Sequence, residues 1–353
     1  MKDVPSAVND HAISIKGNIY SFDITYGPKD FIDVYIFRPA CYIWDLVRTQ
    51  PLPDGRPTRF LGFNVVAYGD CAYVCGGWAP GQSVSGGNLY RFDTNTMTWS
   101  CPEVCGDGPT YVCHVACVVL NCMYIIGSEQ GGTLHFLDLD TYKWHRIHTT
   151  GDAPRCPPFK SACAIGSRIY VFGSAPYDNS VFYLDTVDSK WVRPHVEGVA
   201  PVIRISHAVF VYKGEMYIFG GYNRQQRILF ADLHKYDPGR SCWTQVRPKR
   251  SGPCARVLQA CCVIGDRVFL FRGRTSMRIR GGLSLPGDRQ LVAPHLFAEA
   301  PLTDLHALDF APKLQTLCLA ALIDARVEIV NVPAIVMKEY NAMTERDINQ
   351  PPS

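Results

Sequence analysis

Between residues 204 and 243 apolar and polar positions alternate as they do in the strands of an antiparallel sheet. Residues 207–219 hold two apolar runs, rich in β-branched and aromatic residues, that are joined by a short glycine-containing turn. A glycine pair at 220–221 ends the second run, where a side chain would obstruct a sharp turn or a close contact. Residues 232–237 alternate as a third strand, and Trp243 begins a fourth after a Pro-Gly turn. This stretch predicts one four-stranded antiparallel unit.

The same unit recurs six times along the chain. Its second strand ends, in order, at Phe22, Cys75, Ile126, Phe172, Phe219 and Phe271. A tryptophan begins the fourth strand in five of the six units, at Trp44, Trp99, Trp144, Trp191 and Trp243. These tryptophans lie roughly 50 residues apart, and we expect each to pack between neighbouring units rather than to serve a site. The pattern resembles that of the kelch family, whose repeats are the four-stranded blades of a β-propeller.

The resemblance implies an all-β fold in which residues 1–312 form a six-bladed kelch β-propeller. The sixth unit lacks the tryptophan and contains a long segment, residues 274–303, rich in Gly, Pro and Arg, which we expect to be a mobile loop on one rim. Propellers commonly close by pairing a strand from one terminus into the last blade, because an open ring exposes strand edges. The residues before His11 show no clear pattern for such a strand.

Composition narrows the class of protein. The net charge of +3 gives no general affinity for polyanions, so nucleic acid is not an expected partner. The 15 cysteines are odd in number, no apolar signal segment follows Met1, and many occupy strand positions. They predict reduced core residues in a cytoplasmic protein, with the nucleus as a second compartment. The longest apolar run, residues 317–323, is far too short to span a membrane.

The chain changes character after Phe310. Apolar residues in 313–325 recur at steps of three and four, which predicts an amphipathic helix. Residues 332–340 place a proline near a second helix start. The sequence therefore predicts a helical tail over residues 313–345, followed by a disordered end at 346–353. The simplest role for such helices is to brace the underside of the ring.

The tail also carries two more specific patterns. Leu317, Ala321 and Ala325 resemble an elongin-binding box, in which a leucine and small residues at four-residue steps let a partner helix approach closely. Residues that resemble a short cullin box follow, namely Val332, Pro333, Ile335 and Val336. Both patterns, in this order behind six kelch repeats, resemble the substrate receptors of cullin–elongin ubiquitin ligases. The resemblance implies a non-catalytic receptor that holds target C-termini, often ending in Gly, for ubiquitination and proteasomal degradation.

A peptide site is predicted at the mouth of the ring. The links that enter the inner strands converge there, and they carry Arg59, Arg204 and Arg256, with Ser206 beside Arg204. Arginine binds a carboxylate through two parallel hydrogen bonds, so converging arginines suit a peptide's terminal carboxylate. Each arginine alone reads equally well as a solvated surface residue. Thr110 stands where the family has Arg, so the resemblance does not extend to the family's target sequence.

Other chemistry has less support in the sequence. Cys113, His114 and Cys117 resemble a metal cluster, but on a strand the two cysteines face one way and the histidine the other, which favours core packing. No cofactor is expected, and no nucleophile, base and orienting acid can be placed together. The alternative function is a non-catalytic kelch interaction scaffold. The Arg-rich segment 272–289 favours a nuclear or chromatin-associated location for such a scaffold. An enzyme is the weakest of the three alternatives.

Overall fold

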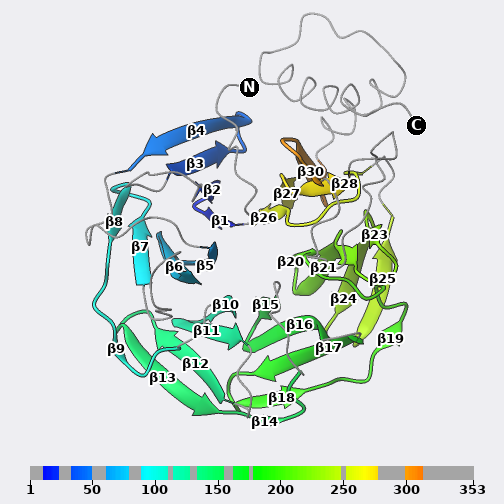
Figure 1. The fold of residues 1–353 in the computed structure, drawn as a ribbon, viewed down its shortest axis with the longest axis horizontal. Helices are drawn as coiled ribbons and strands as arrows, with labels where there is room; N and C mark the ends of the chain where they lie inside the picture. Colours follow the sequence, from blue (N-terminus) through cyan, green and yellow to red (C-terminus); the bar gives the residue numbers. More distant parts are fainter. Residues whose placement is uncertain are drawn as a thin grey trace, which may run out of the picture.

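A computed structural model of the chain describes residues 11–23, 33–49, 61–78, 89–109, 114–127, 133–154, 162–174, 178–247, 252–276 and 299–312. These residues form six mainly antiparallel sheets, arranged as blades around a central axis in chain order, and two short two-stranded hairpins (Figure 1). The predicted six-bladed β-propeller is thereby confirmed. No helix occurs among the residues described, so the structure is all-β throughout this part of the chain.

Each blade is one continuous stretch of chain, with its inner strand first. Blade 1 consists of β1 (Ala12–Ile15), β2 (Asn18–Asp23), β3 (Asp33–Arg38) and β4 (Ile43–Arg48). Blade 2 consists of β5 (Leu61–Tyr68), β6 (Cys71–Trp78), β7 (Leu89–Asp93) and β8 (Thr98–Ser100). Blade 3 consists of β10 (His114–Val119), β11 (Cys122–Gly127), β12 (Thr133–Asp138) and β13 (Lys143–His148).

The second half of the ring follows the same plan. Blade 4 consists of β15 (Ala162–Ile165), β16 (Arg168–Ser174), β17 (Asp178–Asp185) and β18 (Lys190–Val192). Blade 5 consists of β20 (Ala208–Tyr212), β21 (Glu215–Phe219), β24 (Leu233–Asp237) and β25 (Cys242–Val246). Blade 6 has three strands among the described residues, β26 (Ala260–Ile264), β27 (Arg267–Phe271) and β30 (Leu305–Asp309).

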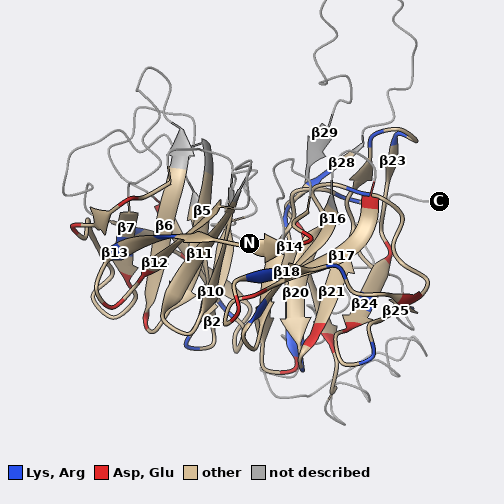
Figure 2. Ribbon diagram, turned by 90° about the horizontal axis from the view of Figure 1, so that it is seen from below, with Lys and Arg blue, Asp and Glu red and all other residues tan. Residues whose placement is uncertain are grey.

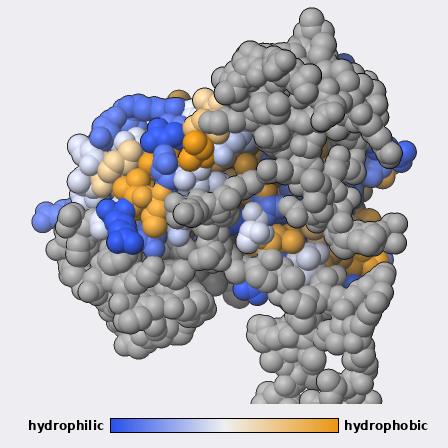
Figure 3. Space-filling model, turned by 90° about the horizontal axis from the view of Figure 1, so that it is seen from above, coloured by the Kyte–Doolittle hydropathy of each residue, from blue (hydrophilic) through white to orange (hydrophobic). Residues whose placement is uncertain are grey.

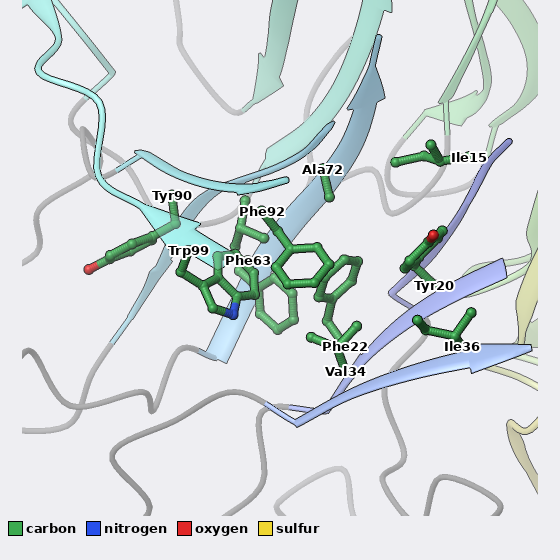
Figure 4. Close-up of a cluster of buried hydrophobic side chains, with 11 residues drawn as sticks. Ile15, Tyr20, Phe22, Val34, Ile36, Phe63, Ala72, Tyr90, Phe92 and Trp99 are labelled. Atoms are coloured by element: carbon green, nitrogen blue, oxygen red, sulfur yellow. The ribbon is translucent and has the colours of Figure 1, made fainter. Parts of the chain in front are cut away.

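The hydrophobic core lies between the blades. Six clusters of buried side chains each join one blade to the next. Figure 4 shows the cluster between blades 1 and 2, where Trp99 packs edge-on against Phe22 at 5.8 Å and beside Phe92 at 4.9 Å. The other repeat tryptophans hold the same place against the preceding blade, as their spacing predicted. The described cysteines are all free thiols, and five of them are buried: Cys71, Cys75, Cys117, Cys163 and Cys262.

The ring closes through side-chain packing between its first and last blades. Among the inner strands, β1 contacts β26 as well as β5, which completes a cycle of six. Phe37 and Phe269 lie 5.4 Å apart across this border, and the Arg267 guanidinium donates a 3.2 Å hydrogen bond to the Tyr42 hydroxyl. Closure in the described part of the chain therefore rests on the same blade-to-blade packing as every other border.

A short parallel strand tightens three of the borders. β9 (Cys105–Gly106), β14 (Thr150–Gly151) and β19 (Glu197–Gly198) leave one blade and pair in parallel with the outer strand of the next, at β13, β18 and β25. At Gly198 φ is +77°, and a Cβ placed there would lie 2.2 Å from the Trp243 carbonyl oxygen. Glycine is required here both by its backbone conformation and by this contact.

Blades 5 and 6 each carry an extra hairpin directly after the glycine that follows the second strand, Gly221 in blade 5 and Gly273 in blade 6. In blade 5 it is β22 (Tyr222–Asn223) with β23 (Ile228–Leu229), and in blade 6 it is β28 (Arg274–Ser276) with β29 (Glu299–Pro301). The ends of the predicted long loop, residues 274–303, are thus paired as a ladder, while residues 277–298 lie outside the described part. No helix among the described residues has the length and hydrophobicity to cross a membrane.

Candidate functional site on the upper face of the ring

Two arginines fix the entry of the chain into blades 5 and 6. Arg204 lies shortly before β20, and its guanidinium donates two hydrogen bonds to the Asp232 carboxylate, one of them 2.9 Å long. Arg256 lies shortly before β26 and donates two bonds of 2.6 Å to Asp304. Because the aspartates precede β24 and β30, each ion pair ties the entering link to the third strand of its own blade. We call these two arrangements the Arg–Asp clips.

Backbone carbonyls complete each clip. Arg204 also donates to the carbonyl oxygens of Val202, at 2.9 Å, and Gly220, at 3.0 Å. Arg256 donates in the same way to Cys254 and Arg272, both at 3.1 Å. Both arginine side chains have no exposed surface, and a guanidinium can be buried only when its donors are satisfied in this way.

A histidine supports each aspartate. His234 Nε2 lies 2.9 Å from Asp232, and His306 Nε2 lies 2.8 Å from Asp304. Burial raises the pKa of Asp232, but the hydrogen bonds from His234 and Arg204 outweigh burial and hold this pKa well below its usual value. The pKa of Asp304 is lowered by the same balance. Both carboxylates are therefore ionised at neutral pH and serve as fixed anions for the buried arginines.

The clips correct one part of the sequence prediction. Arg204 and Arg256 do lie at the predicted place, but their forks are occupied by Asp232 and Asp304 instead of being open toward the mouth. The reason is that a buried cation needs an anionic partner, and the chain supplies one from its own third strand. Binding of a peptide near these residues stays a prediction.

The other site residues fall partly outside the described structure. Ser206 is half-buried and has a φ of +55°, so it forms the bend through which the link turns into β20. Arg59 is outside the described residues, and so are the predicted elongin-binding residues Leu317, Ala321 and Ala325. The predicted cullin-box residues lie there as well: Val332, Pro333, Ile335 and Val336.

Two further residues lie on the side of the ring that bears the blade links and the extra hairpins, which we call the upper face. Ile205 bridges to Tyr222, which pairs with Leu229, so these three residues form a row across the link and hairpin of blade 5. In blade 6 the corresponding row runs from Val257 through Arg274 to Pro301. Tyr222 and Arg274 therefore occupy equivalent positions, each directly after the glycine that ends the second strand. Both are half-buried.

A small cavity lies on the ring axis between the inner strands of all six blades. Its volume is about 160 Å³, and its lining includes the polar side chains of Asn64, His207 and Gln259 among small apolar residues. His207 and Gln259 follow the two clip arginines at the same spacing. Burial and the nearby Arg204 charge lower the pKa of His207 to about 3, so it is neutral at physiological pH. The cavity thus offers neutral hydrogen-bonding groups rather than charges.

The sequence held a signal for the clips that hydrophobic periodicity does not reveal. The segments at 204–207 and 256–259 both read Arg, two residues, then His or Gln, and the segments at 232–234 and 304–306 both read Asp-Leu-His. Because the arginine and the aspartate recur together in blades 5 and 6, the pattern predicts one Arg–Asp ion pair in each of these blades. Cys117 is buried, as its predicted core role requires. Among the described residues, no group of His, Cys, Asp or Glu is arranged to hold a metal ion.

Six blades of this construction around a narrow axis define a kelch-type β-propeller, a fold that presents surface to protein partners. The chain belongs to the kelch-repeat family, because the family model described as KLHDC2/KLHL20/DRC7 Kelch-repeats domain matches residues 62–273.

Similarity to individual proteins extends beyond the family match. The chain is 35% identical over 369 residues to Kelch domain-containing protein 3 of Rattus norvegicus, covering 96% of this chain and 94% of that protein. The protein of the same name from Homo sapiens is 34% identical over the same shares of each chain. A shorter similarity, 26% over 198 residues, links 48% of the chain to 25% of Host cell factor 2 of Homo sapiens. The chain is thus related along nearly its whole length to Kelch domain-containing protein 3.

Proposed function

We propose that this chain is the substrate-recognition subunit of a cullin–elongin E3 ubiquitin ligase. The propeller would bind the C-terminal residues of target proteins, often ending in Gly, for ubiquitination and proteasomal degradation. The subunit performs no chemistry itself. The observation that carries the proposal is the order of segments: an elongin-box-like pattern at 317–325 and a cullin-box-like pattern at 332–336 follow directly behind the six-bladed ring.

Two residues of the upper face support the proposal that a target's C-terminus binds there. Arg274 is a half-buried cation there, and Tyr222 presents an aromatic ring at the equivalent position of the neighbouring blade. A planar guanidinium suits a carboxylate, and an aromatic side chain gives apolar contact to the residues before it. We therefore propose Arg274 as a contact for the carboxylate, with Arg59 and with Ser206 at the bend as further candidates beside the two clip arginines.

The partners that follow are elongin B and elongin C, a cullin, and the C-terminal peptides of targets. Neither nucleic acid nor a membrane belongs to this account, and no cofactor is required for binding. We place the complex in the cytoplasm, with the nucleus as a second compartment.

Affinity purification of the full chain, followed by mass spectrometry, tests the proposal. We expect elongin B, elongin C and a cullin to co-purify, together with targets that accumulate when the proteasome is inhibited. A variant with alanine at residues 332–336 should retain the elongins and lose the cullin, because the two boxes recruit different partners. Recovery of other proteins without elongin or cullin, from the wild type, would instead support the interaction scaffold.

A further inference from the structure

Exposed large hydrophobic residues gather at one place in the described part of the chain. Figure 3 shows one side of the molecule, where hydrophobic areas lie among hydrophilic ones. The described residues expose seven large hydrophobic side chains: Ile43, Leu120, Val187, Val199, Val202, Ile205 and Ile228. Four of these seven lie between residues 199 and 228, on the link that enters blade 5 and on the β22–β23 hairpin. This concentration singles out the upper face of blade 5.

The link and the hairpin form one rigid platform. Ile205 and Tyr222 exchange two backbone hydrogen bonds, each of 2.9 Å. The Asn223 side-chain amide donates to the Ile203 carbonyl oxygen at 3.0 Å, and its oxygen accepts from the Gln226 backbone N–H at 2.9 Å. Asn223 is buried, so the hairpin turn is held from inside. A surface fixed in this way loses little conformational entropy when a partner binds.

The register of the hairpin places its apolar residues. Ile228 is paired with Asn223, and opposite residues in an antiparallel pair point to the same face. Because the Asn223 side chain reaches the Ile203 carbonyl, Ile228 stands on the face of the hairpin that is turned toward the link, next to the segment that carries Val202. Val202 is 47% exposed and Ile228 46% exposed. We call these two residues the blade 5 patch. Ile205 is in register with Tyr222 and therefore points to the opposite face of the hairpin ladder from Ile228.

The charge beside the blade 5 patch is positive. Arg224 and Arg227 are both exposed in the turn of the hairpin, and Figure 2 shows this basic stretch at β23 on the upper side of the ring. Residues 216–231 contain no Asp or Glu, and the next acid, Asp232, is held in its clip. Arg227 adopts a φ of +55°, a conformation that costs a non-glycine residue about 1–2 kcal/mol. Its exposed side chain gains no burial within the chain to offset that cost.

We propose that the blade 5 patch and its two arginines bind an extended acidic segment of a partner protein that carries an aliphatic or aromatic residue. The carboxylates would pair with Arg224 and Arg227, and the apolar side chain would cover Val202 and Ile228. The two contributions need each other, because an exposed ion pair alone adds little affinity and the apolar area alone is small. This surface is separate from the reading of a C-terminus, so its test uses peptides whose C-terminus is amidated.

Fluorescence anisotropy of the full chain with a labelled, amidated peptide tests this surface. The probe is Glu-Asp-Leu-Glu-Phe-Asp-Glu, with two control peptides in which Lys replaces the acids or Ser replaces Leu and Phe. Arg224→Glu with Arg227→Glu should weaken binding of the probe about tenfold or more, and Ile228→Ser should weaken it severalfold. Arg240→Glu is the matched control: it reverses a charge on the same blade, at a side chain that is 86% exposed in the β24–β25 turn. It should leave the affinity unchanged within about twofold.

Three results would overturn the proposal. The double arginine variant could bind the probe as well as the wild type does, or the Arg240 variant could lose as much affinity as the double variant. The third result combines three observations. The Ser peptide binds as tightly as the probe, an oligonucleotide of matched charge displaces the probe, and Ile228→Ser leaves the affinity for the probe unchanged. That result would identify a general polyanion surface. Equal thermal unfolding midpoints for all variants show that the comparison is made on folded protein.

Discussion

The guanidinium group of Arg256 meets the carboxylate of Asp304 in two hydrogen bonds of 2.6 Å each, across 48 residues of chain. The arginine side chain is fully buried, whereas the aspartate is 35% exposed. This clip, and its counterpart between Arg204 and Asp232, joins the entry of a blade to its third strand. The two arginines thus contribute to the stability of the upper face, and their guanidinium donors are occupied within the chain.

Arg256→Lys is expected to lower the free energy of unfolding by about 2 kcal/mol. Lysine keeps the charge, but it cannot bond both carboxylate oxygens and the Arg272 and Cys254 carbonyls at once. Denaturant titration measures the change, with Arg240→Lys at an 86% exposed position as the control that should be neutral. Unchanged stability combined with weaker peptide binding would show that Arg256 contacts the peptide rather than stabilising the fold.

Stability should depend on pH through His207. Its pKa in the folded chain is about 3, below the ordinary value of 6.5, so the unfolded chain binds a proton between these values and the folded chain does not. Stability is therefore lost as pH falls below 6.5 toward 3. His207→Gln places in blade 5 the residue that blade 6 has at the equivalent position, Gln259. Between about pH 7 and about pH 5 the variant should lose about 2 kcal/mol less unfolding free energy than the wild type.

The measurement is the free energy of unfolding at both pH values for wild type and variant. The clip aspartates do not interfere, because their lowered pKa values confine their contribution to pH below the ordinary aspartate range. An equal loss of stability in the two proteins would show that His207 is not the group that titrates.

Gly198→Ala should destabilise the ring more than Gly214→Ala. Both glycines have a φ near +76°, at +77° and +76°, so the backbone strain of alanine is similar at the two positions. A Cβ at Gly198 would lie 2.2 Å from the Trp243 carbonyl oxygen, whereas nothing lies within 4 Å of one at Gly214. We expect the difference in unfolding free energy to be about 2 kcal/mol. Equal losses of unfolding free energy in the two variants would mean that the close contact between Gly198 and the Trp243 carbonyl does not limit the side chain at residue 198.

Repetition explains what the sequence predicts well. Each tryptophan recurs with its hairpin, so Trp99 could be assigned to a blade border, where it packs against Phe22. The clips were missed because the partner of Arg256, Asp304, lies beyond the long insertion of blade 6, and periodicity contains no information on such distant pairs. For the same reason, the sequence did not predict that the Arg204 and Arg256 side chains point to their own blades' aspartates. The helical tail at 313–345 lies outside the described residues and stays a prediction.

Leu317→Asp should abolish co-purification of elongin while the propeller remains folded. A carboxylate at the centre of a helix–helix contact would be buried without a partner, which costs several kcal/mol. Pull-down with purified elongin B and elongin C checks the loss, and an unchanged far-ultraviolet spectrum dominated by β-structure checks the fold. Undiminished elongin binding by the variant would rule out this role for residues 317–325.

We propose that the upper face binds the C-terminus of a target protein. Fluorescence anisotropy with the tail peptide of one co-purifying target, as the free acid and as the amide, measures this binding. We expect the free acid to bind about tenfold more tightly, because amidation removes the anion that Arg274 would contact. Arg274→Lys should weaken binding of the free acid and leave binding of the amide unchanged. Equal affinities of the free acid and the amide would rule out recognition of the C-terminus and favour the interaction scaffold.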